Sequence, residues 1–186
     1  GRDFTLALKT DGTVWAWGNN NLGQLGVPQS ETMQTVGGVI DYGSTLPVQV
    51  TFSELDTSID PETGVQREYI TSIAAGENHS AALTNLGRVF LWGENTYGQL
   101  GNGEESPNKE ESYWDDEGNY ITNYYRDPSY VNEPVRILAG LTDEEGRAIS
   151  FVMVAAGDEF TLALDNFGHV WSWGRNYRGG LGQATG

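Results

Sequence analysis

The chain has 186 residues, of which 38 % are hydrophobic, and a formal net charge of −16. This length is typical of one domain or of part of a larger one, and the apolar content suffices for a packed core. The lack of cysteine excludes disulfides and thiolate metal sites, and no apolar run is long enough to span a membrane. The acidity disfavours binding to nucleic acid or to anionic lipid, so we expect neither nucleic acid binding nor membrane insertion.

The first predicted element is a β-hairpin within residues 1–26. FTLALKT (4–10) and TVWAW (13–17) are short β-rich runs separated by a turn that ends in Gly12. Glycine at that position fits a left-handed residue that closes a tight hairpin. Beyond the hairpin, the sequence continues with Trp-Gly, then Asn, then Gly-x-Leu-Gly.

The link at 27–75 follows, with seven acidic residues, one basic residue and therefore a net charge of −6. Its end contains two further predicted strands, PVQVTF (47–52) and YITSIAAG (69–76). The glycines and acidic residues between them favour long connections.

Residues 76–101 and 157–182 repeat residues 1–26 without a gap, and 11 of the 26 positions are identical in all three copies. Repetition at this level indicates a tandem-repeat architecture. We interpret the Trp as packing between adjacent units, the following Gly as allowing close backbone approach, and the Asn as satisfying loop backbone groups. These structural repeat residues are Trp17, Trp92, Trp173, Gly18, Gly93, Gly174, Asn20, Asn95 and Asn176.

Strands that match 47–52 and 69–76 recur as PVRIL (134–138) and ISFVMVAAG (149–157), ahead of the third hairpin. We therefore predict four strands per unit, each joined to the next in sequence, with both extra strands placed before the hairpin of their own unit. Four-stranded antiparallel meanders in tandem are typical of β-propeller blades, so we predict an all-β partial propeller over 1–186.

The second link, 102–156, has twelve acidic and four basic residues, a net charge of −8, and an aromatic-rich stretch at 113–130. Aromatic side chains presented on loops are typical of interaction surfaces. We therefore predict a protein contact here; the alternative is that the aromatic residues pack the loop onto its own blade or onto the next one. The candidate partner-binding residues are Tyr113, Trp114, Tyr120, Tyr124, Tyr125 and Tyr130.

Metal binding and catalysis find little support in the sequence. The acidic runs Asp115-Asp116-Glu117-Gly118 and Asp143-Glu144-Glu145-Gly146 lack the spacing of calcium loops, so we predict no metal site and no cofactor. Of the two histidines, His79 aligns with Phe4 and Phe160 and is predicted to be interior, whereas His169 follows a turn and is predicted to be exposed. We predict no catalytic residues and no enzyme activity.

The stretch AAGENHSAALTNLGRVFLWGENTYGQLG (74–101) resembles the regulator of chromosome condensation repeat, and the likeness extends to all three hairpins. The resemblance implies a β-propeller, usually of seven blades. The repeat spacing is longer than is usual in that family, because the links carry insertions, and the length gives fewer than three blades. The first residue is Gly, so we expect a trimmed or excerpted chain that is part of a longer ring or is completed by other copies of itself.

These features favour a non-enzymatic protein-interaction or structural module that is extracellular or at the cell surface of a microbe. Its expected partners are another protein or other copies of itself, with assembly into a ring or filament. Resemblance to family members supplies two alternatives, an inhibitor or binder of a secreted hydrolase acting through propeller loops and a guanine-nucleotide exchange regulator.

Overall fold

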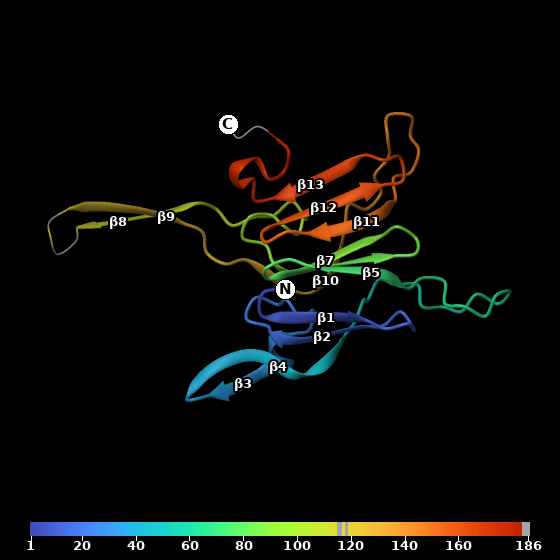
Figure 1. The fold of residues 1–186 in the computed structure, drawn as a ribbon, viewed down its shortest axis with the longest axis horizontal. Helices are drawn as coiled ribbons and strands as arrows, with labels where there is room; N and C mark the ends of the chain where they lie inside the picture. Colours follow the sequence, from blue (N-terminus) through green and yellow to red (C-terminus); the bar gives the residue numbers. More distant parts are fainter. Residues whose placement is uncertain (115–116, 118, 184–186) are drawn as a thin grey trace.

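In the computed structural model the chain is built almost wholly from β-strands, and three antiparallel sheets lie one above another (Figure 1). The structure describes residues 1–114, 117 and 119–183, excluding the side chains of Val36, Trp114, Tyr124 and Tyr125. The prediction of an all-β fold of antiparallel propeller blades is confirmed, as part of a propeller.

The strands are short, and the two helices are single turns. The elements are β1 (Phe4–Leu8), β2 (Val14–Asn19), α1 (Gln29–Thr32), β3 (Met33–Val36), β4 (Val39–Val50), β5 (Ile70–Ala75), β6 (His79–Thr84), β7 (Val89–Glu94), β8 (Lys109–Trp114), β9 (Tyr120–Tyr125), β10 (Tyr130–Ile137), β11 (Phe151–Ala156), β12 (Phe160–Asp165), β13 (Val170–Gly174) and the 3₁₀ turn η1 (Tyr177–Gly179).

Each sheet is one blade, which we name by its order in the chain. The first blade has the strand order β1-β2-β4-β3, the second β5-β6-β7-β10, and the third β11-β12-β13. Strands β8 and β9 pair only with each other in the described structure and form a separate hairpin that extends to one side (Figure 1).

The three predicted hairpins are β1–β2, β6–β7 and β12–β13. Their turn glycines have left-handed backbones, with φ of +81° at Gly12, +74° at Gly87 and +89° at Gly168. The prediction of a left-handed glycine at the end of each turn is therefore confirmed.

The predicted assignment of the Pro-Val strands to blades is wrong. The strand at 47–52 lies in β4, which pairs with β2 of the hairpin before it, with Val14 opposite Val50. The strand at 134–138 likewise lies in β10, which pairs with β7, with Val89 opposite Ile137. Each therefore closes the preceding blade on its outer side, and the long connection after it leads to the inner strand of the next blade.

The two links are also more ordered than connecting loops. Residues 27–75 contain α1, β3, β4 and β5, and residues 102–156 contain β8, β9, β10 and β11. The aromatic stretch forms most of the β8–β9 hairpin, with Tyr113 opposite Ile121. The consecutive β-prone residues Tyr120, Ile121 and Thr122 carry the strand signal of β9.

The hydrophobic core lies between the blades. One cluster joins Leu6, Leu8 and Val14 of the first blade to Phe90 and Trp92 of the second. The same repeat positions recur in a second cluster, where Leu83 and Val89 of the second blade meet Ala163 and Trp173 of the third. The second blade thus buries one face against the first blade and the other against the third. Within the described residues, neither helix has the length and apolar character needed to cross a membrane.

Candidate protein-interaction site

Two of the three repeated tryptophans lie at the joints between blades. Trp92 is fully buried, and its indole N–H donates a hydrogen bond across the joint to the backbone carbonyl of Gln24. Trp173 is half-buried and donates in the same way to Gln99 at 2.9 Å. Trp17 is also half-buried and lies in β2 of the first blade.

The last glycine of each Gly-x-Leu-Gly loop makes room for the indole of the next blade. A β-carbon at Gly26 would lie 2.7 Å from Nε1 of Trp92, and one at Gly101 would lie 2.7 Å from Nε1 of Trp173. Such distances are shorter than van der Waals contact, so only glycine fits without displacing the tryptophan.

The glycines after the tryptophans are approached by their own hairpin. At Gly18, Gly93 and Gly174 the backbone has φ near +100°. A β-carbon at these positions would lie 2.4–2.6 Å from the carbonyl oxygen of the residue just before the paired strand, which is Asp3, Asn78 or Glu159. The requirement for glycine at this position therefore arises within each hairpin, and it recurs in all three hairpins.

The repeated asparagines fold the loop that follows them. The side-chain oxygen of Asn20 accepts a hydrogen bond from the backbone N–H of Leu25 at 3.0 Å, and Asn95 does the same for Leu100. Asn176 accepts from Leu181 at 3.1 Å. This bond lets Leu25 and Leu100 be fully buried beside the tryptophan joint.

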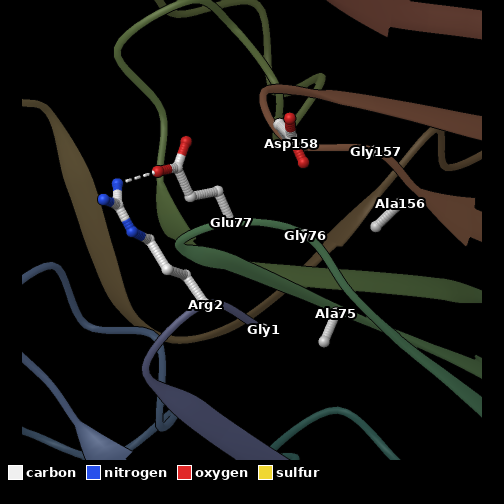
Figure 2. Close-up of a pocket in the computed structure, with 8 residues that line it drawn as sticks. All are labelled: Gly1, Arg2, Ala75, Gly76, Glu77, Ala156, Gly157 and Asp158. Atoms are coloured by element: carbon white, nitrogen blue, oxygen red, sulfur yellow. Dashed lines mark hydrogen bonds and ion pairs between the residues drawn. The ribbon is translucent and has the colours of Figure 1, made fainter.

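A charged pocket of about 460 Å³ lies where the turns after the inner strands meet, and Figure 2 shows the residues around it. The backbone N–H of Arg2 donates to the carbonyl of Glu77, and that of Glu77 donates to the carbonyl of Asp158, both at 3.0 Å. The same repeat position thus bridges each blade to the next. The guanidinium of Arg2 also pairs with the Glu77 carboxylate, which raises the pKa of Arg2.

His79 is buried at the joint of the second and third blades, as the alignment with phenylalanine predicts. Its Nε2 lies 2.9 Å from the hydroxyl of Thr161, which donates its own hydrogen to the carbonyl of Gln99. Nε2 therefore carries the proton, and the buried Nδ1 has no hydrogen-bond partner in the described structure. Burial lowers the pKa of His79 to about 4, so the ring is neutral at pH 7.

His169 is exposed, as predicted, with 70 % of its side chain accessible. Its Nδ1 lies 3.1 Å from the carboxylate of Asp165. Burial acts to raise the pKa of Asp165, but hydrogen bonds from the Trp171 indole, the backbone N–H groups of His169 and Phe167 and the His169 ring hold it below its usual range. The Asp165 carboxylate therefore stabilises the turn between β12 and β13 by accepting these hydrogen bonds.

Of the two acidic runs, the structure describes 143–146 in full and 115–118 only at Glu117. Asp143 accepts hydrogen bonds from the backbone N–H groups of Glu145 and Arg147 and pairs with the Arg147 side chain, which makes it a turn residue. Asp115, Asp116 and Gly118 lie outside the described residues. Among the residues that are described, no group of three or more His, Asp or Glu side chains is placed to hold a metal ion.

The β8–β9 hairpin presents the candidate partner-binding residues. Tyr113 is 47 % exposed, Tyr120 is 59 % exposed and Tyr130 is 40 % exposed. Tyr113 and Ile121 share one face of the hairpin, whereas Tyr120 lies on the other, opposite Trp114. The side chains of Trp114, Tyr124 and Tyr125 lie outside the description, and Tyr130 donates its hydroxyl hydrogen to Gln29 at 3.2 Å.

A second exposed surface has no counterpart among the sequence predictions. The β3–β4 hairpin carries Met33, Val39, Ile40 and Leu46 with much of each side chain exposed. Both hairpins extend from the same side of the stacked blades (Figure 1). The alternation of apolar residues around Gly37-Gly38 is the signal that could have revealed this hairpin from the sequence.

Stacked four-stranded blades, joined by a repeated tryptophan and carrying extended hairpins, define a β-propeller module for protein interaction or regulation. The repeat profile described as Regulator of chromosome condensation (RCC1) repeat matches residues 11–83 and 87–164. The chain belongs to the RCC1 repeat family. A second profile with the same description matches residues 70–99 and 151–179.

Similar proteins include chains that are several times longer than this one. Human Protein RCC2 is 30 % identical over 178 residues, which are 96 % of this chain and 24 % of that protein. Human E3 ubiquitin-protein ligase HERC2 is 30 % identical over 180 residues, which are 96 % of this chain and 3 % of that protein. The chain thus spans a quarter or less of the length of these two relatives.

Solved structures show the same fold. Prp20p from Saccharomyces cerevisiae superimposes with a TM-score of 0.61 at 23 % identity, covering 98 % of this chain and 33 % of that one. Binding to Gsp1p and histones is described for Prp20p. Human WBSCR16 gives a TM-score of 0.58 at 26 % identity, covering 97 % of this chain and 34 % of that one.

Proposed function

We propose that this chain is a protein-binding propeller module that recruits a basic protein through the β8–β9 hairpin. The observation that carries the proposal is the hairpin itself, which stands away from the blades with Tyr113 and Tyr120 exposed on its two faces (Figure 1). Exposed tyrosines supply contact area at a low cost in side-chain entropy, which is why they are enriched in binding surfaces.

The charge of the hairpin region sets the class of partner. The link that contains the hairpin has twelve acidic and four basic residues, and three of the basic ones are already paired, Lys109 with Asp127, Arg126 with Glu105 and Arg147 with Asp143. Complementary charge accelerates association and selects against acidic partners. Histones are basic and are bound by Prp20p, so purified core histones are a suitable probe.

The experiment measures the affinity of immobilised protein for core histones by biolayer interferometry. We expect Tyr113→Ala or Tyr120→Ala to weaken binding at least fivefold, depending on which face of the hairpin contacts the histone. Leu86→Ala is the matched control, because Leu86 is equally exposed but lies in the turn of another hairpin. Unchanged affinity in the Tyr113→Ala/Tyr120→Ala double variant would disprove the role of the hairpin.

Self-assembly is a second candidate function, supported by the outer face of the third blade. Met153, Ala155, Leu162, Leu164 and Val170 line an apolar hollow of about 200 Å³ there. Leu164 and Val170 occupy the repeat positions of Leu83 and Val89, which are buried against the next blade. We propose that the first blade of another copy covers this face, with Trp17 in the place that Trp92 and Trp173 take at the other joints.

Sedimentation velocity over a concentration series tests this second candidate. Self-assembly predicts a sedimentation coefficient that rises with concentration and a Leu164→Asp variant that stays monomeric. A wild-type chain that remains monomeric at every concentration would exclude assembly through this face.

The two alternatives drawn from the family resemblance, an exchange regulator and a hydrolase inhibitor, are tested by separate measurements. Acceleration of nucleotide release from Gsp1p would support the exchange regulator, and loss of activity of a secreted hydrolase on addition of the protein would support the inhibitor. An extracellular or cell-surface location, favoured by the acidic and lysine-poor composition, is tested by fractionation of the native source.

A further inference from the structure

A small pocket lies at the outer rim, where the first and second blades meet. Its walls come from Val27 and Pro28 before α1, from Glu31 in α1, and from Glu133 and Pro134 in β10. Its volume is about 190 Å³, comparable to about six water molecules. The pocket can therefore hold one long side chain but no larger ligand.

The two carboxylates of the pocket are available to a ligand. Glu31 and Glu133 are exposed, and neither carboxylate has a hydrogen bond or ion pair to the described residues. The sequence between Lys9 and Arg67 contains no lysine or arginine at all, so the first blade's half of the pocket has no cation of its own to neutralise Glu31. Two unpaired carboxylates beside prolines favour a side chain with an apolar stem and a cationic end.

The β3–β4 hairpin extends this pocket with an apolar surface. α1 runs directly into β3, so Glu31 is two residues from Met33. Met33 lies opposite Tyr42 and Thr35 lies opposite Ile40, which places all four residues on one face of the hairpin. Met33 is 59 % exposed and Ile40 is 58 % exposed, and the described structure places nothing over them.

We propose that this surface binds an extended basic segment of a protein partner, with one lysine or arginine side chain in the Glu31–Glu133 pocket and apolar side chains against Met33 and Ile40. The inference rests on the proposed function to the extent that the partner is a basic protein. It adds a contact at the joint of the first and second blades, outside the β8–β9 hairpin, and the hydrogen bond from Tyr130 to Gln29 lies across that joint. A single exposed ion pair contributes little to affinity, so both carboxylates and the apolar face are needed for measurable binding.

The probe is a fluorescein-labelled ten-residue peptide of alternating lysine and valine, and binding to the full chain is followed by fluorescence anisotropy. A peptide of alternating glutamate and valine is the control for charge. We expect the lysine peptide to bind, the glutamate peptide not to bind, and the affinity to fall as NaCl is raised from about 0.05 M to about 0.5 M.

Variants locate the site. Glu31→Gln/Glu133→Gln keeps the shape of both side chains and should weaken peptide binding at least fivefold, and Ile40→Ser should weaken it at least threefold. Glu62→Gln/Glu144→Gln, at two exposed carboxylates outside the pocket, should leave it unchanged. Absence of binding, equal binding of both peptides, or a Glu31→Gln/Glu133→Gln affinity within twofold of wild type would each overturn the inference.

The experiments distinguish failure of the proposed β8–β9 contact from failure of the proposed Glu31–Glu133 pocket. Tyr113→Ala/Tyr120→Ala should not affect binding of the short lysine peptide, because those tyrosines lie on the other hairpin. Loss of histone binding in the tyrosine variant together with normal peptide binding in the Glu31→Gln/Glu133→Gln variant would overturn only the pocket. The opposite pattern would overturn only the proposed function.

Discussion

The indole N–H of Trp92 donates a hydrogen bond to the backbone carbonyl of Gln24 at 3.0 Å, across the joint between the first two blades. The hydroxyl of Ser80 donates to the same oxygen at 2.8 Å. One carbonyl in the Gly-Gln-Leu-Gly loop of a blade thus receives two donors from the next blade. The arrangement recurs at Gln99, and this is why the loop and the tryptophan repeat together in the sequence.

Replacement of Trp92 tests the strength of this joint. Trp92→Ala should lower the free energy of unfolding by about 3–5 kcal/mol, because it empties a fully buried position. Trp92→Phe should cost roughly 2 kcal/mol, since Gln24 keeps the Ser80 hydroxyl as a donor. Urea denaturation measures both values. Trp15→Phe is the control, and its effect should stay below about 1 kcal/mol because Trp15 is only half-buried and bonds within its own hairpin.

Substitution of Gly93 tests the close approach inside each hairpin. Gly93 has φ of +98°, and a β-carbon would lie 2.5 Å from the carbonyl oxygen of Asn78. Gly93→Ala should therefore prevent folding or lower the unfolding midpoint severely. Gly103→Ala is the matched control, because Gly103 has φ of +83° but no atom within 4 Å of the added carbon. It should cost only about 1–2 kcal/mol, and equal effects of the two variants in thermal denaturation would contradict the steric explanation.

His79 should make the joint of the second and third blades sensitive to acid. Burial lowers its pKa to about 4, whereas a histidine in the unfolded chain has its ordinary pKa of 6.5. The unfolded chain therefore binds a proton first, so this stabilisation is complete above pH 6.5 and is lost as the pH falls towards 4. The loss amounts to about 3 kcal/mol at most.

His79→Phe provides the matched comparison, because phenylalanine occupies the same repeat position at Phe4 and Phe160. The ring should fit, since Gly76 leaves the same space beside His79 that Gly157 leaves beside Phe160. We expect the stability of His79→Phe relative to wild type to rise as the pH is lowered from 7 to 4. Parallel stability curves for the two proteins would contradict the role of His79.

Removal of the β8–β9 hairpin should leave the blades intact. β8 and β9 pair with each other, and the ion pair of Lys109 with Asp127, which replacement of residues 109–125 by a short Gly-Ser linker removes, is exposed. We expect a change in unfolding free energy of less than about 1 kcal/mol. A large loss of stability in urea denaturation would show that the hairpin is part of the core instead of a binding element.

Much of the fold could be predicted from the sequence because the strongest signals are local. The turn glycine at Gly12 and the β-rich runs around it specify a hairpin within a few residues of chain. The order of the blade could not be predicted in the same way. The strand that ends at Val50 has the same pattern whether it pairs backwards with β2 or forwards with β5, and only three-dimensional packing decides between them.

The candidate site was predictable in part for the same reason. The aromatic content of 113–130 marks an unusual segment, and the consecutive β-prone residues Tyr120, Ile121 and Thr122 favour the strand that the structure shows as β9. The pocket between Glu31 and Glu133 was not predictable, because its carboxylates are about a hundred residues apart and meet only through the joint of two blades. Surfaces built at joints between repeats require knowledge of which faces pack together.

The most direct test of the protein-binding function compares wild type with the variant in which 109–125 is replaced, using isothermal titration calorimetry with purified core histones. The account predicts saturable binding to the wild-type protein and at least a tenfold loss of affinity in the variant, with the urea midpoint unchanged. Equal affinities for the two proteins, with both folded, would contradict it.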